Sequence, residues 1–187
     1  MHEEAKKLFS QELQKLEKEL AQTDQLLYLD GVHPQHNSKP SLLTNTGRKR
    51  ININGALDVK RLEVTTLSSD SINAQSTLDL FKKWEEKYPF AQRIVVICDN
   101  AAYYRSKIVA NYLKISRVEI KFLPPYSPDL NLIERLWRFM NKKVRNNRYY
   151  EKFLDFKTAI YAFFENIRKY REELQPLLSR KFCLVKS

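Results

Sequence analysis

Two short apolar runs that each end in a carboxylate constrain the fold of this chain more than any other feature. Ile94–Cys98 is followed directly by Asp99, and Leu26–Leu29 is followed in the same way by Asp30. Uninterrupted apolar runs of this length are typical of strands buried on both faces, as in sheets with helices on each side. If the two strands are parallel neighbours, their carboxylates lie at the same end of the sheet. The sequence therefore predicts an α/β fold with an acidic edge.

A third carboxylate, Glu134, is predicted to lie early in a helix that follows a proline-rich turn. Ser127 suits the N-cap of that helix, and Pro128 suits its first position. At about 100° per residue, Glu134 falls at the edge of the apolar stripe of the helix, between core and solvent. The stripe consists of Leu130, Ile133, Trp137, Met140 and Val144. An exposed ion pair with Arg138, one turn later, is the alternative role for this glutamate.

Together the three acids predict a divalent-metal site. Carboxylates held a few ångströms apart repel unless a cation lies between them, and magnesium prefers oxygen ligands while keeping positions for water and phosphate. Two such ions can activate a nucleophile and stabilise the leaving oxygen of a phosphodiester. The alternative is that Asp30 and Asp99 are ordinary strand-end residues that hydrogen-bond to their own backbone.

The composition indicates a polyanionic partner. The 187-residue chain is 43% hydrophobic and carries a formal net charge of +11, which is typical of a folded, strongly basic domain. Such a field attracts nucleic acid, although a generically basic protein or one that binds an acidic protein has the same composition. No apolar run is long enough to span a bilayer and no secretion signal is visible. We expect a cytoplasmic, nucleoid-associated protein in which Cys98 is a small buried residue.

Hydrophobic periodicity predicts a mixed five-stranded sheet flanked by helices. The expected strands cover residues 25–31, 51–57, 62–67, 94–98 and 118–123. The expected helices cover residues 1–22, 72–88, 103–115, 127–146 and 152–173, with Asp70 or Ser71 as the N-cap of the second. A three-strand meander followed by alternating helices and strands combines antiparallel with parallel pairing. We divide the chain into an N-terminal amphipathic helix at 1–22, a main domain at 23–173 and a C-terminal tail at 174–187.

The segments around the three acids resemble the catalytic domain of DDE transposases from bacterial insertion sequences of the mariner-like superfamily. The resemblance runs from about Leu26 to Ile167. The motifs that carry it are Leu29-Asp30, Cys98-Asp99-Asn100 followed by Tyr103, and the segment Leu123–Trp137. The 34 residues between Asp99 and Glu134 are the spacing that this superfamily uses. Asn54–Leu57 is also similar to the second strand of the family.

The resemblance implies an RNase H-like fold in which Asp30, Asp99 and Glu134 are catalytic and bind two magnesium or manganese ions. It implies that water first cleaves the transposon end and that the freed 3′-hydroxyl then attacks target DNA, typically at a TA dinucleotide. Synaptic complexes of the superfamily are usually dimeric, so a homodimer is expected.

Full-length members of the superfamily carry N-terminal helix-turn-helix domains that bind the terminal repeats. The helix expected at 1–22 is too short to supply them. We therefore expect either a separate helix-turn-helix protein or domain, or a chain that is a shortened version, one half of a split gene, or a remnant.

Two basic clusters are candidate contacts for DNA phosphates. Arg48, Lys49 and Arg50 lie in the long loop before the second strand, and a second cluster ends the Glu134 helix. The second cluster consists of Lys142, Lys143, Arg145 and Arg148. Phosphate contact makes binding depend strongly on salt, whereas a solvated basic face is the alternative.

Three other polar residues lie near the acids in the sequence, Asn100, His33 and His36. Asn100 is a candidate for supporting the site or for holding a turn. His33 and His36 lack a third nitrogen or sulfur donor and do not predict zinc.

The sequence leaves three functional hypotheses. The first is a transposase domain that cleaves DNA ends and joins them to a target. The second is an RNase H-like nuclease that hydrolyses DNA without strand transfer. The third is an inactive DNA-binding or assembly remnant.

Overall fold

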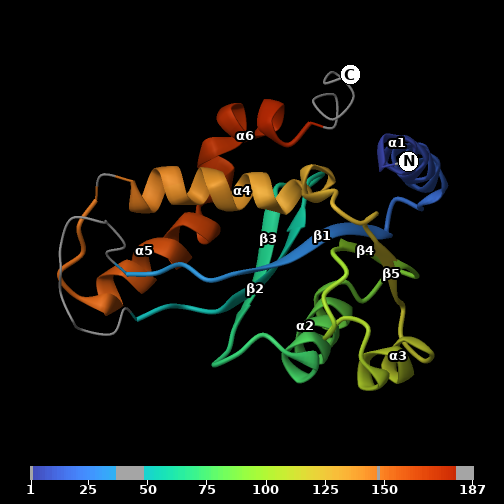
Figure 1. Ribbon diagram of the computed structural model, residues 1–187, viewed down its shortest axis with the longest axis horizontal. Helices are drawn as coiled ribbons and strands as arrows, with labels where there is room; N and C mark the ends of the chain where they lie inside the picture. Colours follow the sequence, from blue (N-terminus) through green and yellow to red (C-terminus); the bar gives the residue numbers. More distant parts are fainter. Residues whose placement is uncertain (1, 37–48, 147, 180–187) are drawn as a thin grey trace.

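The sheet of this protein has the strand order β3-β2-β1-β4-β5 and combines both kinds of pairing (Figure 1). The computed structural model describes residues 2–36, 49–146 and 148–179. The strands are β1 Gln25–Val32, β2 Ile53–Asp58, β3 Glu63–Ser68, β4 Ile94–Cys98 and β5 Val118–Phe122. Strands β1, β2 and β3 form an antiparallel meander, whereas β1, β4 and β5 are parallel. The predicted mixed five-stranded sheet is confirmed.

The central strand β4 explains why its sequence is uninterruptedly apolar. All five of its residues are fully buried. Val95 and Ile97 point into the core on one face of the sheet, whereas Ile94, Val96 and Cys98 point into the core on the other face. A strand covered on both faces cannot alternate apolar and polar residues, because every side chain is removed from water. Cys98 is thus the small buried residue that was predicted.

The described residues form six α-helices, and five of them cover the sheet in two layers (Figure 1). Helices α4, α5 and α6 lie over one face, and α2 and α3 lie over the other. Their bounds are α1 His2–Glu19, α2 Ala74–Lys87, α3 Lys107–Leu113, α4 Leu132–Met140, α5 Phe153–Glu165 and α6 Arg171–Leu177. Three short turns of helix join them, η1 Pro128–Leu130, η2 Asn141–Arg145 and η3 Ile167–Tyr170. None of the described helices is long and apolar enough to cross a membrane.

Helix α1 packs on the same core as α4 and α5, as its amphipathic pattern suggested. Leu13 and Leu16 are buried in that core. Near its other end, the Lys6 ammonium lies 3.0 Å from a carboxylate oxygen of Asp129, in η1. The helix therefore contacts the segment that leads into α4.

Several predicted helix boundaries are wrong, and each error has a local cause. Helix α2 begins later than expected, because Asn73, and not Asp70 or Ser71, forms a reciprocal capping box with Ser76. The helix expected at 127–146 is divided into η1, α4 and a π-helical turn. The helix expected at 152–173 is likewise divided into α5, η3 and α6. The tail expected at 174–187 starts too early, because Leu174 and Leu178 are buried core residues.

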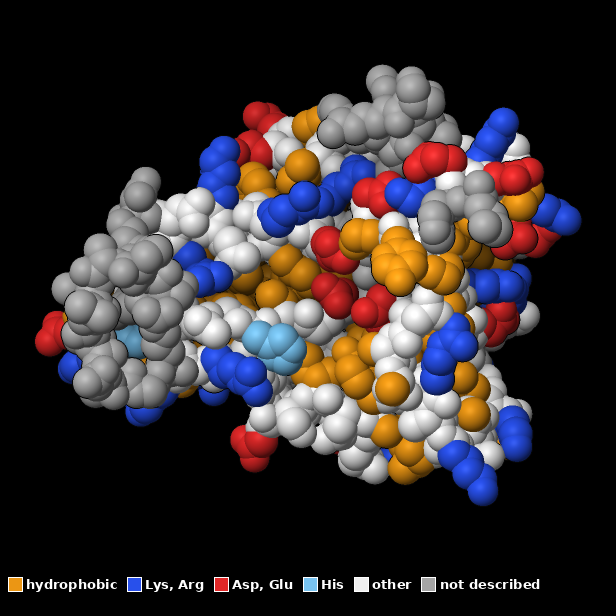
Figure 2. Space-filling view, viewed as in Figure 1, with side chains coloured by type: hydrophobic (Ala, Val, Ile, Leu, Met, Phe, Trp, Pro, Cys, Tyr) orange, Lys and Arg blue, Asp and Glu red, His pale blue; other side chains and the backbone are white. Residues whose placement is uncertain are grey.

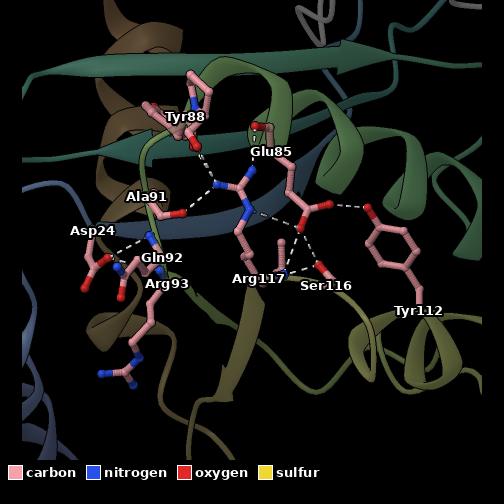
Figure 3. A network of polar contacts seen from close by, with 11 residues as sticks. Asp24, Glu85, Tyr88, Ala91, Gln92, Arg93, Tyr112, Ser116 and Arg117 are labelled. Carbon is pink, nitrogen blue, oxygen red and sulfur yellow. Dashed lines mark hydrogen bonds and ion pairs between the residues drawn. The ribbon is translucent and has the colours of Figure 1, made fainter.

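The amino ends of the parallel strands are joined by a polar network around Arg117, the residue before β5 (Figure 3). Its guanidinium donates to four backbone carbonyl groups, those of Glu85, Tyr88, Pro89 and Ala91. Asp24, the residue before β1, accepts hydrogen bonds from the backbone amides of Gln92 and Arg93. These contacts hold the α2–β4 connection against the starts of β1 and β5.

Candidate active site

Two of the three acids emerge side by side at the carboxyl end of the parallel strands. Tyr28 of β1 pairs with Ile97 of β4, so the same register carried forward by two residues places Asp30 opposite Asp99. Neighbouring strands lie about 4.8 Å apart, which is within reach of two carboxylates for one cation. Asp30 does not end its strand as predicted, because β1 continues to Val32 by pairing with β2.

The third acid is brought to the same edge by a buried contact at the start of α4. The Asn131 side chain donates from Nδ2 to the carbonyl oxygen of Leu29 at 3.1 Å, the residue before Asp30. Glu134 follows one turn later in α4 and is half-buried. Ser127 does not cap the helix as predicted; its hydroxyl donates instead to the carbonyl oxygen of Pro125 at 3.2 Å. The start of α4 is therefore fixed by tertiary contact with β1.

Asp30 and Glu134 both have raised pKa values, and the charge of Asp99 contributes to each rise. Burial and the nearby Glu134 and Asp99 carboxylates raise the pKa of Asp30 to about 7, against the Gly31 amide and the Trp137 indole, which lower it. Burial also raises the pKa of Glu134, with Arg138 acting in the opposite direction and Asp99 adding to the rise. The charged forms of Asp30 and Glu134 are thus less stable than that of a carboxylate in water. A bound cation would stabilise these charged forms again.

Acidic side chains gather near the centre of the face shown in Figure 2, with hydrophobic side chains beside them and Lys and Arg side chains around the rim. Within residues 2–36, 49–146 and 148–179, no three His, Cys, Asp or Glu side chains are close enough to hold a metal ion as they stand. The donor set nevertheless fits a hard divalent cation, because it consists of carboxylates and includes one whose charged form is disfavoured by burial and by its acidic neighbours.

The structure brings a further side chain to the site that the sequence placed only in the apolar stripe. Trp137 donates from Nε1 to Oδ2 of Asp30 at 3.1 Å. Room for the indole is provided by Gly55, which pairs with Asp30 across the β1–β2 ladder. A Cβ at position 55 would lie 2.7 Å from Cη2 of Trp137. The resemblance of Asn54–Leu57 to the family's second strand was the only sequence signal for this glycine.

Asn100 braces the loop that follows β4. Its Nδ2 donates to the carbonyl oxygen of Leu123 at 2.7 Å, and its Oδ1 accepts from the Arg105 guanidinium. Arg105 in turn lies over the ring of Phe122 at 4.2 Å from the centroid. Both ends of the amide are thus used to join the end of β4 to the end of β5, which favours the turn-holding role over direct support of a ligand.

The basic residues differ in how firmly the protein holds them. Lys143 lies 2.7 Å from a carboxylate oxygen of Glu173, and Arg145 donates to Oδ1 of Asn141 at 2.9 Å. Lys142 and Arg148 are exposed, as are Lys49 and Arg50. Arg48 lies outside the described residues. Lys49 also lies over the ring of Phe153, with its ammonium 5.9 Å from the centroid. Exposed cations can reach a phosphate without first breaking an internal ion pair.

His33 and His36, which follow β1, both have partners within the protein. His33 Nδ1 lies 2.8 Å from Oδ1 of Asn52. His36 donates from Nε2 to the carbonyl oxygen of Tyr150 at 2.7 Å, and its ring packs against Phe153 and Phe156. These contacts join the segment after β1 to the start of β2 and to α5.

Residues 30–157 match the family model of the DDE superfamily endonucleases. Among curated proteins, the chain is 24% identical over 133 residues to the insertion element IS630 uncharacterized 39 kDa protein of Shigella sonnei. It is 35% identical over 65 residues to the uncharacterized protein y4pE/y4sA of Sinorhizobium fredii. The matched regions cover 71% and 34% of this chain but only 37% and 45% of the two relatives. The chain therefore spans less than half the length of either.

Solved structures with the same fold include catalytic domains of a mariner transposase. The crystal structure of the catalytic domain of Mos1 mariner transposase matches with a TM-score of 0.64 and 17% identity, covering 95% of this chain and 91% of that one. The structure of the Mos1 catalytic domain with Raltegravir and Mn matches with a TM-score of 0.65 and 16% identity, covering 93% and 88%. These likenesses establish that the five-stranded mixed sheet has the arrangement of an RNase H-like transposase catalytic domain.

Proposed function

Since this chain belongs to the DDE superfamily of endonucleases, we propose that it cleaves DNA ends and joins them to target DNA, with Asp30, Asp99 and Glu134 as its catalytic acids. The observation that carries the proposal is the convergence of three acids from β1, the end of β4 and α4, two of which have raised pKa values. Isolated strand-end or surface acids would not raise one another's pKa in this way.

The three carboxylates would hold two divalent cations, magnesium or manganese. Bound ions of this kind lower the pKa of an attacking water or hydroxyl and neutralise charge on the scissile phosphate. The solved Mos1 catalytic domains with Mn and with Mg support this choice of metal. The protein's own contribution is to fix the direction of the three carboxylates, through the β1–β4 register and the Asn131 contact with Leu29.

The exposed cations provide the second part of the proposal, which is contact with DNA phosphates. Four exposed cations can contact the DNA backbone without losing an internal ion pair given by the structure. They are Lys49, Arg50, Lys142 and Arg148. Lys143 and Arg145 would contact DNA only after leaving Glu173 and Asn141. Binding should therefore weaken steeply with salt, in proportion to the number of phosphates contacted.

Wider features of the proposal concern the assembly. We include in it a homodimeric synaptic complex, insertion at TA and recognition of transposon ends by a helix-turn-helix domain. We also include the division into a helix at 1–22 and a catalytic domain that starts at residue 23 and extends past 173 to include the buried Leu174 and Leu178. The solved Mos1 complexes, among them a pre-cleavage transpososome and a strand transfer complex, support the assembly by analogy of fold.

A strand-transfer reaction tests the proposed function. A labelled duplex with a free 3′-hydroxyl end is incubated with the protein, supercoiled plasmid and Mn²⁺, and the products are separated and sequenced at the junctions. Label joined to plasmid by the native chain, but not by Asp99→Asn, supports transposase chemistry. Plasmid nicking without joining would indicate the plain nuclease instead. Neither product from a folded, DNA-binding protein would support the inactive remnant.

A further inference from the structure

The two tryptophans of this chain have different environments, and within the described residues only one of their indole N–H groups has an acceptor. Trp137 is 5% exposed, and its Nε1 lies 3.1 Å from Oδ2 of Asp30. Trp84 in α2 is fully buried, and its Nε1 has no hydrogen-bond partner in the described part of the chain. The Trp137 contact joins residues that are 107 positions apart in the sequence, one in α4 and the other in β1.

The Trp137 ring is confined from two directions. On the sheet side, an added Cβ at Gly55 would lie 2.7 Å from Cη2 and 3.1 Å from Cζ2, closer than side-chain atoms ordinarily approach. Gly55 does not have a positive φ, so the position requires glycine for space and not for backbone conformation. On the helix side, the ring meets Phe164 of α5 edge to face, with centroids 5.7 Å apart. The N–H therefore has little freedom to point elsewhere.

Helix α4 carries both Glu134, one acid of the proposed site, and Trp137, the hydrogen-bond donor to a second acid, Asp30. Glu134 and Trp137 are three residues apart in α4, and residues at this spacing share a helix face. The start of α4 is fixed to β1 by the hydrogen bond from Asn131 to Leu29. One rigid element thus sets the position of Glu134 directly and the orientation of Asp30 through the indole.

We infer that Trp137 is a positioning residue of the metal site: its N–H occupies one oxygen of the Asp30 carboxylate and directs the other toward the cation, in a space that Gly55 keeps open. The inference rests on the proposed function, because it takes Asp30 to be a metal ligand. A carboxylate with one oxygen held by a fixed donor cannot rotate freely, so less freedom is lost when the cation binds. Removing contacts that orient a ligand typically weakens metal binding by about 10- to 100-fold.

Direct binding of Mn²⁺, followed by electron paramagnetic resonance of the free ion, tests the inference without relying on cleavage. Trp137→Phe keeps an aromatic ring but removes the donor, and we expect its Mn²⁺ dissociation constant to rise about tenfold. Trp84→Phe is the matched control, because it makes the same change at an N–H without an acceptor, and it should bind Mn²⁺ like the native chain. Circular dichroism melting identifies any variant that has not folded.

A second variant keeps the indole and displaces it. Gly55→Ala places a methyl group against the Trp137 ring, so the N–H should shift away from Asp30 and Mn²⁺ binding should weaken in the same direction as in Trp137→Phe. In the Trp84→Phe background, Trp137 is the only tryptophan. Its fluorescence should then be quenched by Mn²⁺, and the quenching should disappear when Asp99→Asn is added.

The outcomes separate the two proposals. If Asp99→Asn and Asp30→Asn bind Mn²⁺ as tightly as the native chain, the metal site of the proposed function is wrong. If those variants lose Mn²⁺ but folded Trp137→Phe and Gly55→Ala bind it normally, only the positioning role of Trp137 is overturned. Equal weakening in Trp84→Phe would also overturn it, since the effect would then be one of general packing.

Discussion

The two ends of the parallel strands use the same residue types in opposite ways. At the amino ends, Glu85 accepts hydrogen bonds from Ser116 and the Arg117 amide at 2.9 and 2.8 Å, and from the Tyr112 hydroxyl (Figure 3). Glu119, in the edge strand β5, receives two hydrogen bonds from the Arg93 guanidinium, at 2.7 and 2.8 Å. At the carboxyl ends, by contrast, acids face other acids.

The pKa shifts express this difference. The pKa of Glu85 is lowered, because its hydrogen bonds from Tyr112, the Arg117 amide and Ser116 outweigh the effect of burial. The hydrogen bond from Arg93 likewise lowers the pKa of Glu119. Burial and neighbouring charge instead raise the pKa of Asp30 to about 7. Acids at the amino end are thus compensated by the protein itself. At the acidic edge, the Trp137 and Gly31 contacts of Asp30 and the charge of Arg138 beside Glu134 compensate burial only in part, which leaves a net rise in pKa for a bound cation to offset.

Replacing an acid at the carboxyl end should therefore abolish activity with little loss of stability. We expect Asp99→Asn to reduce DNA cleavage by on the order of 10³-fold, the range seen when a group that stabilises transition-state charge is removed. DNA binding in a salt titration should remain close to native. Glu119→Gln, a matched change of carboxylate to amide at the other end, should cleave DNA at the native rate. Equal losses in the two variants would contradict the division of roles.

Disrupting the amino-end network should have the opposite signature. Arg117→Ala leaves four backbone carbonyl groups without their donor, and we expect it to lower the free energy of unfolding by about 2–4 kcal/mol. Urea unfolding followed by circular dichroism measures the change. Below the unfolding transition, the variant should still bind Mn²⁺.

Arg93→Ala serves as the control for that experiment. Its partner Glu119 is more exposed than the network around Arg117, with 41% of the side chain accessible, and exposed ion pairs contribute about 0–1 kcal/mol. A loss at Arg93 as large as that at Arg117 would show that the number of backbone contacts does not determine the stability of this end.

The pH dependence of stability should have opposite signs at the two ends. In metal-free protein, Asp30 has a pKa of about 7 when folded and an ordinary value near 4 when unfolded, so the folded state holds an extra proton between these values. Below about pH 4 Asp30 is protonated in both states and does not lower the free energy of unfolding. As the pH rises from about 4 to about 7, the free energy of unfolding falls, because the unfolded state releases its proton first. Asp30→Asn should be more stable than the native chain at pH 8, by on the order of 4 kcal/mol for a shift of about three pKa units, and equal to it at pH 4.

Glu119→Gln provides the comparison in the same urea experiments with EDTA. The pKa of Glu119 is lowered by folding, so its stabilising effect is present above its unfolded pKa and is lost as the pH falls through the folded value. The amide variant should consequently be less stable than the native chain at pH 8 and should approach it in acid. A stability gain at pH 8 for both amide variants would contradict the contrast between the ends.

The sequence predicted the frame of the site because the frame depends on local patterns. Strand β4 was predicted at its observed bounds, since a strand buried on both faces must be apolar throughout. The adjacency of Asp30 and Asp99 followed from two such runs in parallel. The position of Glu134 at the core boundary followed from helical periodicity, and the structure places it half-buried in α4.

The details that depend on partners distant in sequence were not predictable in the same way. The 127–146 segment looked like one helix, but Asn131 is held by Leu29 and α4 begins only after it. Trp137 fitted the apolar stripe, and nothing in that pattern indicates that its N–H meets Asp30. A glycine at position 55 in a strand does not by itself indicate that the Trp137 ring fills the space of its missing side chain. The catalytic roles of the acids stay predictions until the variants are measured.

The smallest effect is expected at Trp84, which lies next to Glu85 in α2 and is the one indole donor without an acceptor in the described residues. Trp84→Phe removes buried volume, which costs stability, but it also removes an unsatisfied N–H, which relieves a desolvation penalty of about 1–3 kcal/mol. The two terms oppose each other, so urea unfolding should show a net change within about 1 kcal/mol.

Trp84→Ala separates the two terms, because it removes the same N–H and nearly all of the ring. Truncation of a buried tryptophan to alanine costs about 3–5 kcal/mol, so this variant should unfold at much lower urea than Trp84→Phe. If Trp84→Phe were instead destabilised by several kcal/mol, the indole N–H would have a partner in solution that the structure does not show.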